Sequence, residues 1–236
     1  MARVAIIAAM FREVHPLVRE MQPLKYLPDK RVQLYQNETA VVAYAGMGRE
    51  RAIIASRAAL ATGEISALVS AGWAGGLNAG ALSGQVVQPA TVIDAFSGKC
   101  YGTSGGSGVL VTVQLVAGLE EKRRLGELYH GDYVDMEASA VAECAGEAHL
   151  PFHCFKAISD AHDARLPDMN RFNRNGQFSV WRFIAHIGVR PQLWGVVAEM
   201  SRASLDSRDA LCKRLEHWMG EGRHSALSSE HSAKKA

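Results

Sequence analysis

Short apolar runs alternate with amphipathic or alanine-rich stretches along most of the chain. Runs too short for a helix predict buried strands, and a spacing such as that of Val14, Leu17, Val18 and Met21 predicts a helix. The predicted strands are Val4–Ala9, Val32–Tyr35, Thr39–Tyr44, Ala67–Ala71, Gln85–Ile93, Val109–Val113, Tyr133–Met136 and Phe152–Ile158. The predicted helices are Glu13–Met21, Arg49–Thr62, Leu119–Leu128, Glu137–His149, Phe178–Ile187 and a long helical region over Pro191–Trp218. This alternation predicts an α/β fold with one mixed, mostly parallel sheet flanked by helices on both faces.

Glycine and polar residues predict where the chain is not regular. A glycine-rich turn, Gly72–Gly76, follows the strand at Ala67–Ala71, and the composition of Lys99–Gly108 predicts a flexible loop. No composition shift marks a domain boundary, so we expect a single domain over residues 1–219. The polar residues 220–236 predict a disordered tail.

The overall composition excludes several partner classes. Hydrophobic residues make up 48% of the 236, and the net charge of +2 gives no electrostatic argument for nucleic acid as a partner. We expect the basic run Lys122–Arg124 to be a solvated surface. The four cysteines are widely spaced, which predicts reduced thiols in a cytoplasmic protein. No apolar stretch reaches the roughly 18 residues of a transmembrane helix.

Three carboxylates, Glu13, Glu137 and Asp160, each follow a different predicted strand. Because open α/β sheets bind ligands at the carboxyl ends of their strands, the three side chains are expected to converge on one catalytic site. Each also has a purely structural interpretation, since Asp160 suits a helix N-cap and the two glutamates suit a first helical turn. His162 and Asp163 lack a third ligand of suitable spacing, so we expect no metal and no cofactor.

The turn Gly72–Gly76 is a second candidate element of the site. Small residues there let a ligand approach the backbone and its N–H groups. The alternative is that this turn has only a structural role. It does not match a Walker phosphate-binding loop, because no Gly-Lys-Ser/Thr follows it, and the spacing of its glycines does not match a dinucleotide-binding fingerprint.

Five motifs in order resemble the nucleoside phosphorylase/nucleosidase superfamily over roughly residues 3–165, and most closely its methylthioadenosine/S-adenosylhomocysteine nucleosidase branch. The motifs are Ala8–Val14, Ala45–Gly48, Ser70–Leu77, Val134–Ala138 and Ala157–Asp160. The resemblance implies a three-layer α/β/α enzyme that acts on a small-molecule nucleoside. It also implies a homo-oligomer, most simply a dimer.

The resemblance implies roles for the motif residues. Asp160 would hold or protonate the purine N7, and Ser159 would place that aspartate. Glu137 would accept hydrogen bonds from ribose hydroxyls while Met136 packs on the sugar, and Glu13 would activate the attacking water. The remaining residues expected at the substrate come from the same motifs: Met10, Met47, Trp73, Ala74, Gly75 and Asp135.

The departures from the family pattern leave three functions open. Trp73 stands where the family has a serine, Ser70 aligns with an arginine that holds phosphate in the phosphorylases, and Lys156 replaces another arginine. These changes favour a purine (adenine) nucleosidase that uses water. A phosphate-dependent phosphorylase is the first alternative. A non-catalytic purine-binding protein is the second, and it would follow if Trp73 filled the cleft between Glu137 and Asp160.

The middle of the chain is shorter than in the family. Only Asp94–Gly108 joins two predicted strands, and the small residues Val116 and Ala117 align where relatives clasp the base and the 5′ substituent. This short form is similar to the hopanoid-associated branch, whose substrate is an adenosyl triterpene. We therefore expect an open, partly apolar entrance, floored by the Gly72–Gly76 turn, and a bulky or lipid-like 5′ group.

Overall fold

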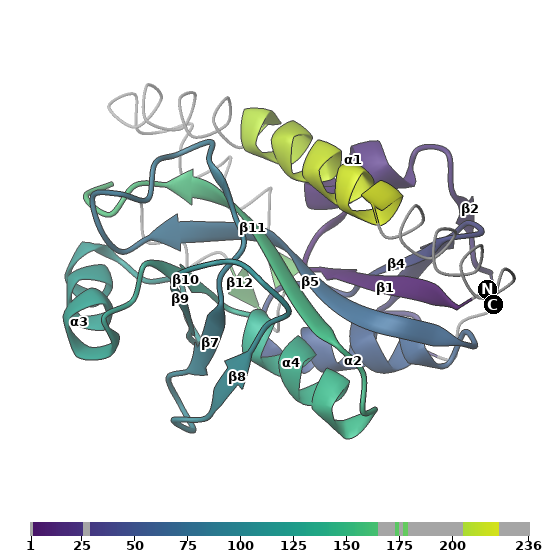
Figure 1. Ribbon diagram of the computed structural model, residues 1–236, viewed down its shortest axis with the longest axis horizontal. Helices are drawn as coiled ribbons and strands as arrows, with labels where there is room; N and C mark the ends of the chain where they lie inside the picture. Colours follow the sequence, from purple (N-terminus) through teal and green to yellow (C-terminus); the bar gives the residue numbers. More distant parts are fainter. Residues whose placement is uncertain (1, 26–28, 165–172, 175–176, 179–204, 222–236) are drawn as a thin grey trace, which may run out of the picture.

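The computed structural model describes residues 2–25, 29–164, 173–174, 177–178 and 205–221. Its centre is a mixed sheet with strand order β2-β3-β4-β1-β5-β10-β9-β7-β8, in which β11 pairs with β5, and β6 pairs with β11. Helices lie on both faces of this sheet, as Figure 1 shows. The predicted α/β fold, a single domain with a mixed sheet between helices, is therefore confirmed.

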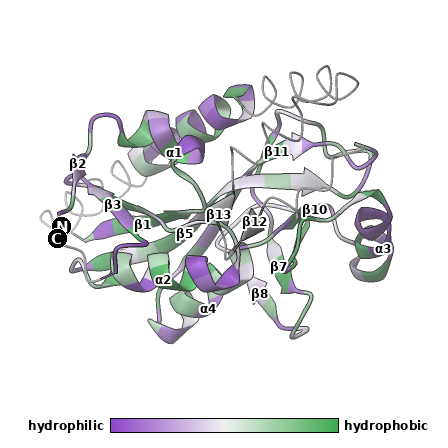
Figure 2. Ribbon diagram, turned by 180° about the vertical axis from the view of Figure 1, so that it is seen from behind, coloured by the Kyte–Doolittle hydropathy of each residue, from purple (hydrophilic) through white to green (hydrophobic). Residues whose placement is uncertain are grey.

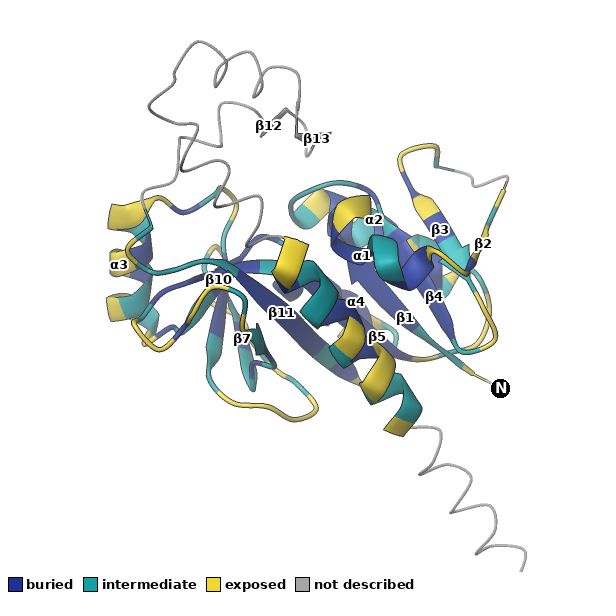
Figure 3. Cartoon of the chain, turned by 90° about the horizontal axis from the view of Figure 1, so that it is seen from above, coloured by how far each residue is buried: buried dark blue, intermediate teal, exposed yellow. Residues whose placement is uncertain are grey.

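The long central pairings are parallel. Strand β1 (Arg3–Ala8) lies between β4 (Ala40–Tyr44) and β5 (Ile65–Gly76), and β11 (Phe152–Asp160) runs parallel to β5. These strands are buried almost throughout (Figure 3) because helices cover both faces, which explains their continuous apolar runs. The other strands are β2 (Gln22–Pro23), β3 (Gln33–Gln36), β6 (Val86–Val87), β7 (Thr91–Asp94), β8 (Cys100–Gly102), β9 (Val109–Thr112), β10 (Tyr133–Asp135), and a separate pair, β12 (Asn173–Arg174) and β13 (Gln177–Phe178).

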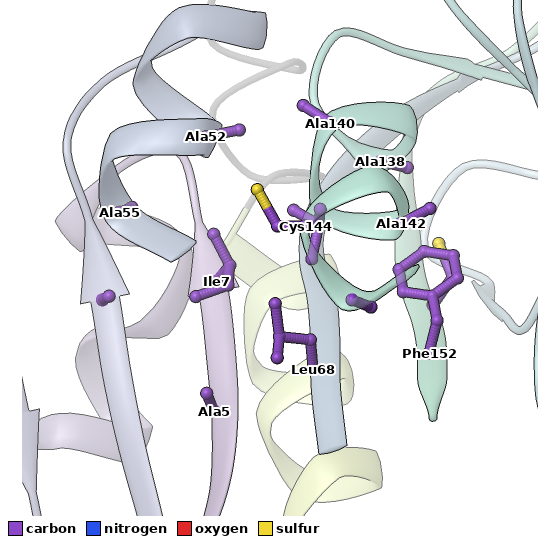
Figure 4. Close-up of a cluster of buried hydrophobic side chains, with 14 of the residues drawn as sticks. Ala5, Ile7, Ala52, Ala55, Leu68, Ala138, Ala140, Ala142, Cys144 and Phe152 are labelled. Carbon is purple, nitrogen blue, oxygen red and sulfur yellow. The ribbon is translucent and has the colours of Figure 1, made fainter. Parts of the chain in front are cut away.

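Two helices cover each face of the central strands. Helices α2 (Arg49–Leu60) and α4 (Ala138–Glu147) lie on one face, and α1 (Phe11–Val18) lies on the other beside the helix at 205–221, drawn in yellow-green in Figure 1. Alanines on α2 and α4 bring both helices close to each other and to the strands. Figure 4 shows this packing around Ile7 and Leu68, which are both buried. A tight alanine interface of this kind fixes where the N-terminus of α4 meets the sheet.

Helix α3 (Leu119–Tyr129) lies at the far end of the sheet, beside β9 and β10. It is mostly hydrophilic in Figure 2, and its buried face places Leu125 against Val111, Val134 and Leu77. This small cluster anchors α3 next to the carboxyl ends of β5 and β11, where the candidate site lies.

Three predicted boundaries differ from the structure. The segment Gly72–Gly76 is not a turn, because β5 continues through Gly76 and pairs with β11 on one side and β10 on the other. The predicted strand Gln85–Ile93 divides into β6 and β7, which flank Pro89 and pair with different partners. Part of the predicted loop Lys99–Gly108 is the strand β8, which forms a hairpin with β7.

The C-terminal predictions are only partly described. The helix at 205–221 confirms the last part of the predicted helical region Pro191–Trp218, and it buries Leu211, Cys212 and Leu215 against the sheet. The predicted helix Phe178–Ile187 and the tail from residue 222 lie outside the described residues, whereas residues 220 and 221 are helical. Within the described ranges, no helix combines the length and the apolar character that a membrane crossing needs.

Candidate active site

Glu13 lies in the first turn of α1, directly after β1. Its Oε2 accepts hydrogen bonds from the backbone N–H groups of Ala9 and Met10, both at 2.9 Å. Glu13 therefore caps the N-terminus of α1, which is the structural role expected for it. Its carboxyl group is also buried, which a helix cap alone does not require. Burial raises the pKa of Glu13, and the backbone hydrogen bonds and Lys156 oppose this shift. A carboxyl group with a raised pKa is a better acceptor for a proton from water.

Gly72 provides the space that the Glu13 carboxyl group occupies. A Cβ atom at this position would lie 3.3 Å from the carboxyl carbon and from both its oxygens, and the φ of Gly72 is +152°. Position 72 is therefore glycine because the Glu13 carboxyl group approaches the strand closely there. The turn that the sequence suggested is not the reason.

Asp135 and Lys156 form a buried ion pair beneath the site. Lys156 Nζ lies 2.8 Å from Asp135 Oδ2, and the two side chains are 1% and 0% exposed. Asp135 also accepts hydrogen bonds from Thr112 Oγ1 at 2.7 Å and from the backbone N–H of Ala138 at 2.8 Å. Burial favours the neutral amine, but the charges of Asp135, Cys154 and Glu137 raise the pKa of Lys156. Lys156 therefore stays protonated, and the pair supports the segment that carries Glu137.

Glu137 is the N-cap residue of α4 and connects two segments of the site. Its Oε1 accepts a hydrogen bond of 2.7 Å from the backbone N–H of Gly48, the N-cap of α2. Burial, followed by the charge of Asp135, raises the pKa of Glu137 to about 7, while Lys156 acts in the opposite direction. Glu13 also raises this pKa, so the two glutamates lie close enough to interact. Glu137 therefore changes its charge near neutral pH.

Asp160 is the last residue of β11, and both its oxygens accept hydrogen bonds. Ser159 Oγ donates to Oδ1 at 2.5 Å, and Lys122 Nζ forms an ion pair with Oδ2. Lys122 Nζ also donates to the backbone carbonyl of Ala161 at 2.7 Å. The lysine side chain is 2% exposed. The predicted solvated surface at Lys122–Arg124 is therefore wrong for Lys122, because this lysine points inward from α3.

A cavity of about 120 Å³ lies beside Asp160. It is smaller than the roughly 300–1,000 Å³ of a site for a drug-sized ligand, so it has room for only part of a nucleoside, such as its base. Its lining residues come from β5, β10, the segment between β9 and α3, α3 itself and the end of β11. They are Ala74, Gly75, Val113, Leu115, Val116, Ala117, Lys122, Val134, Asp135, Met136, Ser159 and Asp160.

The structure brings six of the predicted site residues to this cavity: Asp160, Ser159, Met136, Asp135, Ala74 and Gly75. Glu137 directly follows the lining residue Met136 in the chain, and the Glu13 carboxyl group lies against Gly72, two residues before Ala74 in β5. Met10 and Met47 do not line the cavity. The backbone N–H of Met10 donates to Glu13, and Met47 precedes Gly48, whose backbone N–H donates to Glu137. The three carboxylates therefore gather at one end of the sheet, as their positions after separate strands predict.

Trp73 does not fill this cavity. Trp73 is not among the residues that line it, although its neighbours in β5, Ala74 and Gly75, are. Its ring packs with the core on the α1 face, and the Arg12 guanidinium lies 5.6 Å from the ring centroid. The condition that would favour a non-catalytic protein, a tryptophan between Glu137 and Asp160, is not met within this cavity.

Lys122 is the site residue that the sequence did not reveal. Its position relative to Leu125, Gly126 and Tyr129 follows the spacing of the inner face of a helix, and this spacing was the available signal. A charged residue flanked by Arg123 and Arg124 suggested solvent instead. Among the described residues, no group of three or more histidine, cysteine or acidic side chains could hold a metal ion.

Comparisons with known proteins agree with this geometry. Residues 3–117 match the family model described as the phosphorylase superfamily. No curated protein sequence matches the chain. The resemblance to the nucleoside phosphorylase/nucleosidase superfamily, inferred from the five motifs, is therefore confirmed.

Several solved structures share the fold at low sequence identity. A mutant of the Helicobacter pylori methylthioadenosine/S-adenosylhomocysteine nucleosidase, with 5′-methylthioadenosine in its active site, has a TM-score of 0.71 and 16% identity, covering 94% of this chain and 99% of that one. Futalosine hydrolase from the same organism has a TM-score of 0.70 and 17% identity, with 93% and 98% covered. The Arabidopsis thaliana 5′-methylthioadenosine nucleosidase has a TM-score of 0.68 and 16% identity, with 93% and 96% covered.

Proposed function

We propose that this protein is a purine nucleoside N-glycosidase that transfers the ribosyl group to water. The observation that carries the proposal is the position of Asp160. Its carboxylate is held by Ser159 and Lys122 and lines a cavity of the size of a base. Met136 lines the same cavity, and Glu137 is the next residue in the chain. A base at Asp160 would then place its sugar beside Glu137.

The residue types suit the cleavage of a ribosyl C–N bond. The sugar becomes cationic as the bond breaks, and nearby carboxylates stabilise that charge. Glu137 keeps one oxygen on the backbone N–H of Gly48, and its other oxygen remains for ribose hydroxyls. Glu13, with Oε2 bound to the backbone of α1 and a raised pKa, is the group that accepts a proton from the attacking water.

Water is the proposed acceptor because the two buried lysines at the site, Lys156 and Lys122, are each paired with a carboxylate. Lys156, which replaces a family arginine, is paired with Asp135, and Trp73 replaces the serine expected beside a phosphate. Neither substitution favours the binding of a phosphate anion at this site. A phosphate-dependent phosphorylase is the alternative that the assay below distinguishes.

We further propose that the substrate is an adenosine with a large apolar 5′ substituent, such as an adenosyl-hopanoid. The described cavity lining contains no aromatic side chain, and Leu115 at its edge is 64% exposed. A long alkyl group would cover such apolar surface, at about 25 cal/mol per Å². Adenine as the base follows the neighbours named for methylthioadenosine. A cytoplasmic homo-oligomer, most simply a dimer, stays a prediction.

The test is adenine release from a panel of 5′-substituted adenosines in phosphate-free buffer. We expect turnover without phosphate, and a kcat/KM more than about tenfold higher for a long 5′-alkyl group than for the methylthio group, which corresponds to about 1.4 kcal/mol. Strict dependence on phosphate would establish the phosphorylase alternative. A preference for the methylthio group would remove only the apolar-substituent proposal, and no release from any compound would remove the nucleosidase proposal.

A further inference from the structure

The N-terminus of helix α2 donates directly to Glu137. The N-cap residue of α2 is Gly48, whose backbone N–H lies 2.7 Å from Glu137 Oε1 and whose φ is +92°. Glycine adopts this φ without steric cost, but it has no side chain that could accept a hydrogen bond from the first turn of the helix. Because helix ends fray, the placement of the Gly48 N–H depends on what else holds this turn.

Arg49, the first residue of α2, anchors the turn. Its guanidinium donates to Asp94 Oδ2 at 3.1 Å and forms a second ion pair with Glu143. Asp94 ends β7 and is buried, and its Oδ1 accepts a hydrogen bond of 2.9 Å from the backbone N–H of Phe96. Glu143 lies on α4, the helix whose N-cap residue is Glu137. One side chain therefore connects the start of α2 both to the sheet and to α4.

The chemistry of the guanidinium suits this connection. It is planar and always charged, and its N–H groups form a rigid fork that can bind two carboxylates at once. Alanines such as Ala52 and Ala55 pack the body of α2 against the core (Figure 4), but they lie beyond its first residues. Arg49 therefore fixes the end of the helix that the alanines do not reach.

We propose that Arg49 is a positioning residue for Glu137, and this inference rests on the proposed function. By holding the first turn of α2, Arg49 keeps the Gly48 N–H on Oε1 of Glu137. The second oxygen of the glutamate is thereby directed to the ribose hydroxyls. Loss of the anchor weakens the Gly48 contact and misplaces the carboxylate, and a small misplacement of a group that contacts the substrate lowers turnover.

Four groups from four different elements act on the charge of Glu137. Asp135 on β10 and Glu13 on α1 disfavour its carboxylate form, whereas Lys156 on β11 and the Gly48 N–H at the start of α2 favour it. Of these four, only the Gly48 contact depends on the anchor. A weaker Gly48 contact raises the pKa of Glu137, so at a given acidic pH a smaller fraction of the glutamate is the carboxylate.

The experiment compares Arg49→Met and Arg49→Lys with the wild-type protein in the pH profile of adenine release from a 5′-substituted adenosine. We expect Arg49→Met to lower kcat/KM by about tenfold on the plateau of the profile, as for a misplaced substrate contact. The acid limb should also move to higher pH by about half a pH unit, as for a weakened hydrogen bond. Lysine keeps the charge but cannot bridge both carboxylates, so Arg49→Lys should recover part of the loss.

Arg57→Met is the matched control. Arg57 joins the same two helices through Glu147, at 3.7 Å, but this pair is exposed and lies at their C-terminal ends. We expect its acid limb and its kcat/KM to equal those of the wild type. An acid limb of Arg49→Met that stays at the wild-type pH would overturn the proposal, even if the melting temperature fell, because Arg49 would then be only structural. An equal change in Arg57→Met would overturn it as well.

A second measurement separates this inference from the proposed function. The pKa of Glu137 is followed by NMR in protein labelled with ¹³C at the glutamate carboxyl groups, which requires no substrate. We expect a higher pKa of Glu137 in Arg49→Met than in the wild type or Arg57→Met, and an unchanged pKa would contradict the role of Arg49. A wild-type protein that releases no adenine would instead overturn the nucleosidase proposal itself.

Discussion

Lys156 and Asp135 are joined by a buried ion pair of 2.8 Å that connects β11 to β10, two strands that each pair with β5 and not with each other. Asp135 also holds the first turn of α4 through Ala138. The pair therefore fixes the position of Glu137 relative to the strand that ends in Asp160.

Lys156→Met should destabilise the protein strongly, because it leaves the Asp135 carboxylate buried without its partner. The expected loss is about 3–5 kcal/mol in the free energy of unfolding, measured by urea denaturation. The double variant Lys156→Met/Asp135→Asn should recover part of this loss, since asparagine keeps an acceptor without a charge. Lys99→Met is the control, because Lys99 is 63% exposed in its pair with Glu143 and should cost less than about 1 kcal/mol. Equal losses for the two lysines would contradict this account.

Gly72→Ala should lower activity through Glu13. The added Cβ would lie 3.3 Å from the Glu13 carboxyl group, and the φ of +152° is unfavourable for alanine. We expect kcat to fall at least tenfold and the melting temperature to fall as well. Gly146→Ala is the matched control, because a Cβ there has open space within the helix α4 and should stabilise it by about 0.5–1 kcal/mol. Unchanged kinetics in Gly72→Ala would show that the placement of Glu13 does not matter for turnover.

The pH profile should report the ionisation of Glu137. Burial and Asp135 raise its pKa to about 7, so the carboxylate that accepts ribose hydroxyls is lost as the pH falls below that value. We expect kcat/KM to decrease about tenfold per pH unit below about 7 and to level off above it, since this quantity follows the free enzyme. Glu137→Gln should lower kcat/KM and remove this acid limb. Glu147→Gln, exposed on the same helix, should keep it. A limb that persists unchanged in Glu137→Gln would assign it to another group.

Asp160→Asn should remove most of the turnover while the protein keeps its native fold, with some loss of stability because the buried Lys122 ammonium loses its charged partner. The amide is nearly isosteric and keeps a hydrogen-bond acceptor, but it cannot balance the charge of Lys122. We expect a loss of about 10²–10⁴ in kcat with an unchanged circular dichroism spectrum. Asp163→Asn, in the exposed loop three residues further along, should behave as the wild type. A loss of less than threefold in Asp160→Asn would leave this residue only a structural role.

The sequence predicted the fold and the convergence of the carboxylates because both follow from local patterns. Apolar runs such as Val4–Ala9 and Phe152–Ile158 mark strands that are buried on both faces, and a carboxylate after each strand must lie at the same edge of a parallel sheet. Glu13 shows that two interpretations can hold together, since one carboxyl group both caps α1 and lies in the site.

The errors arose where tertiary packing decides the outcome. The glycines at positions 72, 75 and 76 suggested a turn, but here they make room for Glu13, the Lys122–Asp160 pair and Ala81 within a strand. Lys122 resembled its arginine neighbours in sequence, and only the position of α3 against β9 and β10 shows that it points inward. Local composition contains no information on such contacts.

The most direct test of the central claim is the identity of the sugar product. The wild-type protein is incubated with a 5′-substituted adenosine, with and without inorganic phosphate, and the products are identified by mass spectrometry. The account predicts adenine and the free 5′-substituted ribose under both conditions, at equal rates. A sugar 1-phosphate that forms only when phosphate is present, with no adenine released in its absence, would contradict it.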